Sequence, residues 1–123
     1  MSTQIIKINR GDSYNLIVPI LEKNSTKKYI LNPTEAVYFA LVYPNQRFED
    51  AIFIKGFDYR DQDEKTGDIN ISITPNVTRM LAPGIYYYTV KLQRGGTLET
   101  IDDFDEPEEV RTLIERTKFI INE

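Results

Sequence analysis

The chain has 123 residues with no cysteine and no histidine, and it carries a formal net charge of −4. Its length is typical of one domain, so we expect a single unit over 1–123, and its acidity disfavours nucleic acid as a partner. The missing residue types exclude disulfides and cysteine-built zinc sites and remove the commonest general base. We therefore predict that the protein is not an enzyme, and we assign it no catalytic, metal or cofactor residues.

Short alternations of apolar and polar residues, separated by turn residues, recur along the chain and are typical of half-buried strands. In chain order these runs lie at 5–8, 14–20, 36–43, 51–57, 68–74, 85–92, 97–101 and 112–121. Thr74 directly before Pro75 predicts one or two helical turns near 75–81, since threonine caps helices and proline suits their first position. The pattern predicts an all-β antiparallel sandwich of about seven or eight strands with one short helical turn.

Two of these runs predict their own place in a sheet. In the run 14–20, alternation sends Tyr14, Leu16, Val18 and Ile20 to the core face. Pro19 has no N–H to donate, so this strand should lie at a sheet edge or be bulged there. The run 36–43 is apolar on both faces, which indicates a central strand that is covered on both sides.

Two loops resemble binding motifs, but a structural role explains each of them better. Arg10-Gly11-Asp12 is the tripeptide that integrin ligands display, yet a tight turn is required at this point between two strands. The loop 58–68 is rich in carboxylates that could hold Ca²⁺, but their spacing does not fit an EF-hand. We expect a solvated hairpin loop, whose acidic residues are Asp58, Asp61, Asp63, Glu64 and Asp68.

A second acidic segment follows the tyrosine-rich run. It includes Asp102, Asp103, Asp105 and Glu106, with Phe104 among them. One interpretation is a solvated loop; the other is a docking element that settles on a basic patch of a neighbouring subunit with Phe104 as its anchor. Its carboxylates could also be paired for glycoside hydrolysis, but a loop gives no rigid scaffold to fix their separation.

The run 85–92 contains three consecutive tyrosines. Alternation places Tyr86 and Tyr88 on one face and Tyr87 on the other. Core packing explains such residues, and tyrosine is also favoured at protein interfaces. Tyr87 and Pro19 therefore join the acidic segment as candidate partner contacts.

Four segments, taken in order, carry a resemblance to a known family. They are Arg10-Gly11-Asp12 and the stretches 66–75, 81–92 and 112–121. Together they resemble the immunoglobulin-like β-sandwich modules of tailed-bacteriophage virions, including the N-terminal domain of baseplate upper proteins. The resemblance implies an immunoglobulin-like sandwich that acts as a baseplate, tail or capsid assembly element and carries no catalytic residues. The chain stops at Glu123 without a following coiled coil, which favours an adaptor, decoration or accessory subunit.

The resemblance also implies partners and a location. We expect contacts with other virion structural proteins, as a homo-oligomer or part of a ring, after synthesis in the cytoplasm of a bacterial host. The chain contains no apolar stretch of the ~18 residues that a membrane helix needs and no secretory signal, so we expect no membrane partner. The alternative is a carbohydrate- or receptor-binding sandwich, which the absence of tryptophan weakens.

Overall fold

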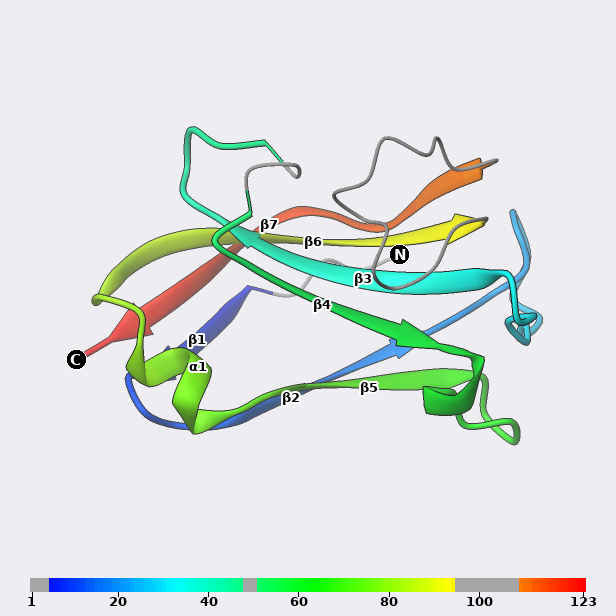
Figure 1. Ribbon diagram of the computed structural model, residues 1–123, viewed down its shortest axis with the longest axis horizontal. Helices are drawn as coiled ribbons and strands as arrows, with labels where there is room; N and C mark the ends of the chain where they lie inside the picture. The colour runs from blue at the N-terminus through cyan, green and yellow to red at the C-terminus, as the bar shows by residue number, and fades with distance from the viewer. Residues whose placement is uncertain (1–4, 48–50, 95–108) are drawn as a thin grey trace.

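The computed structural model describes residues 5–47, 51–94 and 109–123 (Figure 1). Within them it contains seven strands, one short α-helix and a 3₁₀ turn. They are β1 (Ile6–Asn9), β2 (Tyr14–Pro19), β3 (Glu35–Val42), β4 (Phe53–Asp58), η2 (Tyr59–Asp61), β5 (Asp68–Ile73), α1 (Pro75–Arg79), β6 (Gly84–Arg94) and β7 (Glu109–Asn122). The expected strand at 97–101 lies outside the described residues, and β7 begins earlier than its apolar run indicates.

The strands form two sheets, and Figure 1 shows β2 and β5 running together beneath the larger sheet. The larger sheet has the order β1-β7-β6-β3-β4, and the smaller one pairs β2 with β5. The predicted all-β sandwich is confirmed. Its neighbouring strands are antiparallel except for β1, which is parallel to β7. The adjacent strands β7, β6, β3 and β4 correspond to G, F, C and C′ of an immunoglobulin variable-type sandwich, and β2 and β5 correspond to B and E.

The packing of the smaller sheet follows from the alternation of apolar and polar residues along β2 and β5. Leu16 and Val18 on β2 are buried, as are Ile69, Ile71 and Ile73 on β5, whereas Pro19 is exposed. In the described part of the chain β2 pairs with β5 alone, so it is an edge strand as the proline predicts. The sheet buries an isoleucine-rich face against the larger sheet.

The larger sheet is centred on β3, which is buried at all eight of its positions and lies between β6 and β4. This confirms the central strand expected from its apolar run. Inside the sandwich, the ring of Phe39 stacks on Tyr88 at 5.6 Å between centroids, and Tyr88 meets Phe119 edge-on at 6.4 Å. Tyr88 lies two residues after Tyr86, where antibody domains place a disulfide cysteine. Tyr88, packed against Phe39 and Phe119, therefore stands at the position of that cysteine.

One corner of the sandwich is tied by side-chain hydrogen bonds. The hydroxyl of Tyr86, near the start of β6, donates to the carbonyl oxygen of Ala82 at 2.6 Å, which is the tyrosine corner of immunoglobulin-like sandwiches. Burial is the main cause that raises the pKa of Tyr86. The buried Thr78 of α1 accepts from the Gly11 N–H at 3.1 Å and donates to the Asp12 carbonyl at 2.8 Å. The β1–β2 turn is therefore fastened to α1.

That turn is the Arg10-Gly11-Asp12 segment. Gly11 has φ of +90°, which favours glycine, and the Asp12 N–H donates to the Asn9 carbonyl at 3.0 Å. The Nε of Arg10 donates to the Arg79 carbonyl at 3.1 Å. The predicted tight turn is confirmed, and the arginine lies against α1.

Candidate interaction surfaces

The first candidate surface lies on the outward side of β6 and β7, opposite the core. Tyr86 and Tyr88 are buried in the core, and Tyr87 is half-buried on the other side, as alternation predicts. The guanidinium carbon of Arg116 lies 4.6 Å from the centroid of the Tyr87 ring, a cation–π contact. Lys118 lies directly across from Tyr87 in the β6–β7 pairing. We call this surface the Tyr87–Arg116 face; it comprises Tyr87, Thr89, Lys91, Thr112, Arg116 and Lys118.

Arg116 also holds the turn that follows β3. Its guanidinium donates to the carbonyl oxygens of Gln46 at 2.7 Å, Tyr43 at 3.3 Å and Pro44. A hydrogen bond within the turn also stabilises it, because the Gln46 side-chain oxygen accepts from the Tyr43 N–H at 3.0 Å. The planar cation over Tyr87 is therefore fixed in place before any partner arrives, and less conformational entropy is lost on binding.

A shallow depression of about 400 Å³ extends this face toward the turn. Among the described residues, Arg47, Lys91 and Arg116 line it with one carboxylate, that of Glu115. The described part of its lining is thus positively charged, on a chain whose formal net charge is −4. A surface of this charge favours an acidic neighbour.

The second candidate surface is the edge of the smaller sheet at Pro19. The side of β2 away from β5 carries no strand among the described residues, and Ile17 on the outer face is 54% exposed. The free edge of β5 differs, because the Nζ of Lys55 on β4 reaches the Ser72 carbonyl at 3.4 Å. The β2 edge is therefore the more open of the two for strand addition.

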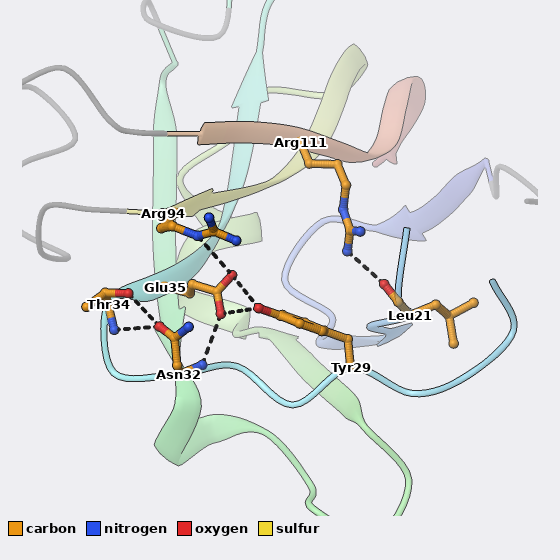
Figure 2. Close-up of polar contacts among 7 residues, drawn as sticks. All are labelled: Leu21, Tyr29, Asn32, Thr34, Glu35, Arg94 and Arg111. Atoms are coloured by element: carbon orange, nitrogen blue, oxygen red, sulfur yellow. Dashed lines mark hydrogen bonds and ion pairs between the residues drawn. The ribbon is translucent and has the colours of Figure 1, made fainter. Parts of the chain in front are cut away.

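The third candidate surface is a pocket at the end of the sandwich where β2 leads into β3 and where β6 ends and β7 begins. Figure 2 shows its polar floor, in which the carboxylate of Glu35 lies between Tyr29, Asn32 and Arg94. The Tyr29 hydroxyl donates to the two carboxylate oxygens at 2.7 and 2.9 Å, and the Asn32 N–H donates at 3.0 Å. The Nε of Arg94 lies 3.9 Å from the carboxylate. Glu35 is thus a buried charge with several partners, as buried charges require.

Cationic side chains line the same pocket as this carboxylate. The pocket has a volume of about 560 Å³, and Lys23, Lys28, Arg94 and Arg111 line it together with Glu22 and Glu35. Arg111 donates to the Leu21 carbonyl at 2.8 Å, and this bond ties β7 to the chain just after β2 (Figure 2). The side chains of Tyr29, Ile30 and Leu92 contribute apolar surface to the wall of the pocket. Burial, followed by the hydrogen bond to Glu35, raises the pKa of Tyr29.

A buried glutamine, Gln62, fixes the 21–34 connection that forms one wall of the pocket. The side-chain oxygen of Gln62 accepts from the Leu31 N–H at 2.8 Å, and its Nε2 donates to the carbonyls of Tyr29 and Gly67, each at 2.8 Å. The Nζ of Lys28 donates to the Glu64 and Lys65 carbonyls at 3.0 Å. The 21–34 connection is therefore joined to the 62–67 connection by several bonds.

The acidic loop 58–68 uses its carboxylates for local turns. Asp58 accepts from the Arg60 N–H at 2.9 Å, and Asp61 accepts from the Asp58 N–H at 2.9 Å, which caps η2. The hydrogen bond from the Arg60 side chain lowers the pKa of Asp58. Among the described residues no group of three or more potential ligands is placed to hold a metal ion. Asp61, Asp63 and Glu64 are exposed, as expected of a solvated loop. The predicted hairpin is wrong, because β4 belongs to the larger sheet and β5 to the smaller one, so the loop crosses between the sheets.

The sequence-predicted contact residues do not gather in one place. Tyr87 lies on the outward face of the larger sheet, whereas Pro19 lies on the edge of the smaller one. The remaining candidates, which are Phe104, Asp102, Asp103, Asp105 and Glu106, lie outside the described residues. Residues that sequence reasoning missed are Arg116, which orders the first surface, and the pocket residues Glu35, Arg94 and Arg111. Of these four residues only Glu35 has a local signal in the sequence, namely a carboxylate directly before the apolar run of β3.

Across residues 5–47, 51–94 and 109–123, no helix has the length and apolar character needed to cross a bilayer. The sequence matches no protein-family model and no curated protein.

Proposed function

We propose that the chain is a structural subunit of a bacteriophage particle that holds other virion proteins through direct contacts. The resemblance to phage immunoglobulin-like modules supplies the context. The observation that carries the proposal is the Tyr87–Arg116 face, where a tyrosine and an ordered arginine stand together on the outward side of a rigid sheet. Tyrosine and arginine are the residues that interfaces and their energetic hot spots favour.

The face serves as the contact with a neighbouring subunit. Its base is two long antiparallel strands, so its side chains keep fixed spacing when a partner binds. Its positive depression suits a partner whose surface is acidic. Copies of this chain are acidic on average, so contact between copies in a ring is one arrangement that the charges allow.

The test compares assembly of matched variants. The chain is produced with the structural proteins encoded beside it, and particle incorporation is measured after gradient purification. Size-exclusion chromatography with light scattering gives the state of the chain alone. The Tyr87→Ser variant should lose incorporation or oligomerisation while its circular dichroism spectrum stays unchanged. Tyr59→Ser is the control, because Tyr59 is an exposed tyrosine on η2, away from this face.

Two results would overturn the proposal. One is a wild-type chain that stays monomeric and joins no particle. The other is an assembling chain in which Tyr87→Ser and Tyr59→Ser behave alike. A monomer that binds glycans on an array would instead support a carbohydrate-binding module.

A further inference from the structure

The side of the sandwich where β4 and β5 lie presents two strand edges. In the described part of the chain β4 is the last strand of the larger sheet and pairs with β3, and β5 pairs with no strand other than β2. The edge of a sheet presents N–H and C=O groups that can pair with a strand of another chain. This side of the sandwich can therefore take an added strand unless side chains prevent it.

The edge of β5 is engaged at both of its ends. The Asp63 N–H donates to the Asp68 carbonyl at 2.9 Å. At the other end, the Nζ of Lys55 donates to the Ser72 carbonyl at 3.4 Å and so reaches from the larger sheet to the smaller one. A strand added to β5 would have to displace both donors.

Lys55 lies on the core side of β4. It is paired with the core residue Phe39 on β3, and residues paired across two strands lie on the same face of a sheet. Phe53 and Phe57, two positions before and after Lys55, belong to the core or pack against it. The Nζ of Lys55 lies 5.5 Å from the centroid of the Phe57 ring, a cation–π contact. Lys55 is thus a half-buried cation on the inward face of an edge strand.

The sequence around Lys55 is that of a strand that associates readily. Residues 51–57 are Ala-Ile-Phe-Ile-Lys-Gly-Phe, in which the lysine is the single charged residue. Windows of about five to seven apolar, β-forming residues with little charge and no proline favour pairing between chains. An inward-pointing lysine on an edge strand opposes such pairing, because an added strand would bury its ammonium group away from water.

We propose that Lys55 prevents the β4–β5 side of the sandwich from pairing with a second copy of this chain. Its charge makes strand addition along β4 unfavourable, and its contact with the Ser72 carbonyl covers the edge of β5. The inference goes beyond the proposed function, because it assigns a residue that excludes one contact between copies and leaves the Tyr87–Arg116 face for the neighbouring subunit.

The experiment measures the association of full-chain variants by size-exclusion chromatography with light scattering over a range of concentrations. Lys55→Met removes the charge and keeps a long unbranched side chain, so it should fold and pack between Phe53 and Phe57. It should form higher oligomers at concentrations at least about ten-fold below those at which the wild type forms them. Lys55→Arg keeps the charge and should behave as the wild type does.

Two further variants separate the role of this position from a general loss of charge. Lys27→Met makes the same replacement at an exposed lysine of the 21–34 connection and should leave the state of association unchanged. Lys55→Gln removes the charge without adding apolar surface and should also associate beyond the wild type. Circular dichroism checks that each variant keeps the wild-type fold.

Hydrogen exchange followed by mass spectrometry locates the contact. In the associated Lys55→Met sample, the amides of 51–58 should exchange more slowly than in a dilute sample of the same variant, because strand addition protects edge amides.

The inference is overturned if both neutral variants at Lys55 fold but associate no further than the wild type, or if both fail to fold, which would assign Lys55 to stability. It is also overturned if Lys27→Met associates as strongly as Lys55→Met, or if association leaves exchange in 51–58 unchanged. These measurements use the chain alone, so their outcome is independent of the Tyr87→Ser assembly result.

Discussion

The strongest quantitative test of the structure is Glu35→Gln. The substitution keeps the shape of the side chain but replaces one carboxylate oxygen by an NH₂ group, which cannot accept from Tyr29. In the wild type the carboxylate accepts from the Tyr29 hydroxyl and the Asn32 N–H while its side chain is 1% exposed. Hydrogen bonds to a charged partner contribute about 1.5–3 kcal/mol each. One acceptor position is lost together with the charge, so the free energy of unfolding should fall by about 2–3 kcal/mol.

Arg94 should contribute less to this loss than the hydrogen bonds do. Its Nε lies 3.9 Å from the carboxylate, beyond hydrogen-bond distance, and its side chain is 41% exposed. Solvent therefore screens the pair, and the coupling energy between Glu35→Gln and Arg94→Gln in a double-mutant cycle should be about 0.5–1 kcal/mol.

Urea unfolding followed by circular dichroism gives the four free energies of the cycle. Glu115→Gln on the exposed side of β7 is the control and should change stability by less than about 0.5 kcal/mol. If Glu35→Gln costs less than about 0.5 kcal/mol, the buried hydrogen bonds do not stabilise the fold as argued. A coupling energy above about 2 kcal/mol would assign the stabilisation to the ion pair instead.

Three further predictions concern stability. Tyr86→Phe should cost about 1 kcal/mol and lower Tm by about 3–5 °C, whereas Tyr87→Phe should not, by scanning calorimetry. Gly67→Ala should cost at least about 1 kcal/mol more than Gly11→Ala in urea, because both have positive φ but only the Gly67 Cβ would meet Lys28 Cβ, at 2.8 Å; equal costs would contradict this. Burial raises the pKa values of Tyr29, Tyr38 and Tyr86, so their stabilisation is present below the ordinary tyrosine pKa of about 10 and is lost as pH rises through the folded values. The urea concentration at the midpoint of unfolding should therefore decrease once the pH exceeds about 10, in step with the rise of phenolate absorbance at 295 nm. A midpoint that does not change with pH in this range would refute the role given to the buried tyrosines.

The strand positions were predictable where side-chain alternation or a continuous apolar run marked them. The alternation from Tyr14 to Ile20 gave the inward face of β2, and Pro19 gave its edge position, because both depend on neighbouring residues alone. The helical turn was also placed correctly, although the Thr74 side chain makes no capping hydrogen bond and its carbonyl closes the turn instead.

The pocket was beyond sequence reasoning because its partners are distant in the chain. Arg111 reaches Leu21 across 90 positions, and Glu35 meets Arg94 only because β3 and β6 are adjacent in the sheet. A lone carboxylate before an apolar run reads as an ordinary strand boundary. The register shifts between β6 and β7, which bury both Leu113 and Ile114, likewise arise from pairing and not from local pattern.

The parallel pairing of β1 with β7 has a mechanical consequence. Ile6 lies opposite Phe119 and Asn9 lies opposite Asn122, so the first and last strands run side by side in the same direction. Tension applied between the two ends of the chain would draw these strands past each other lengthwise, and the slanted hydrogen bonds of the parallel ladder would bear the load together instead of one at a time. Resistance to pulling is set by the unfolding rate. A pull on the two ends is therefore borne in shear by this short parallel pair of strands.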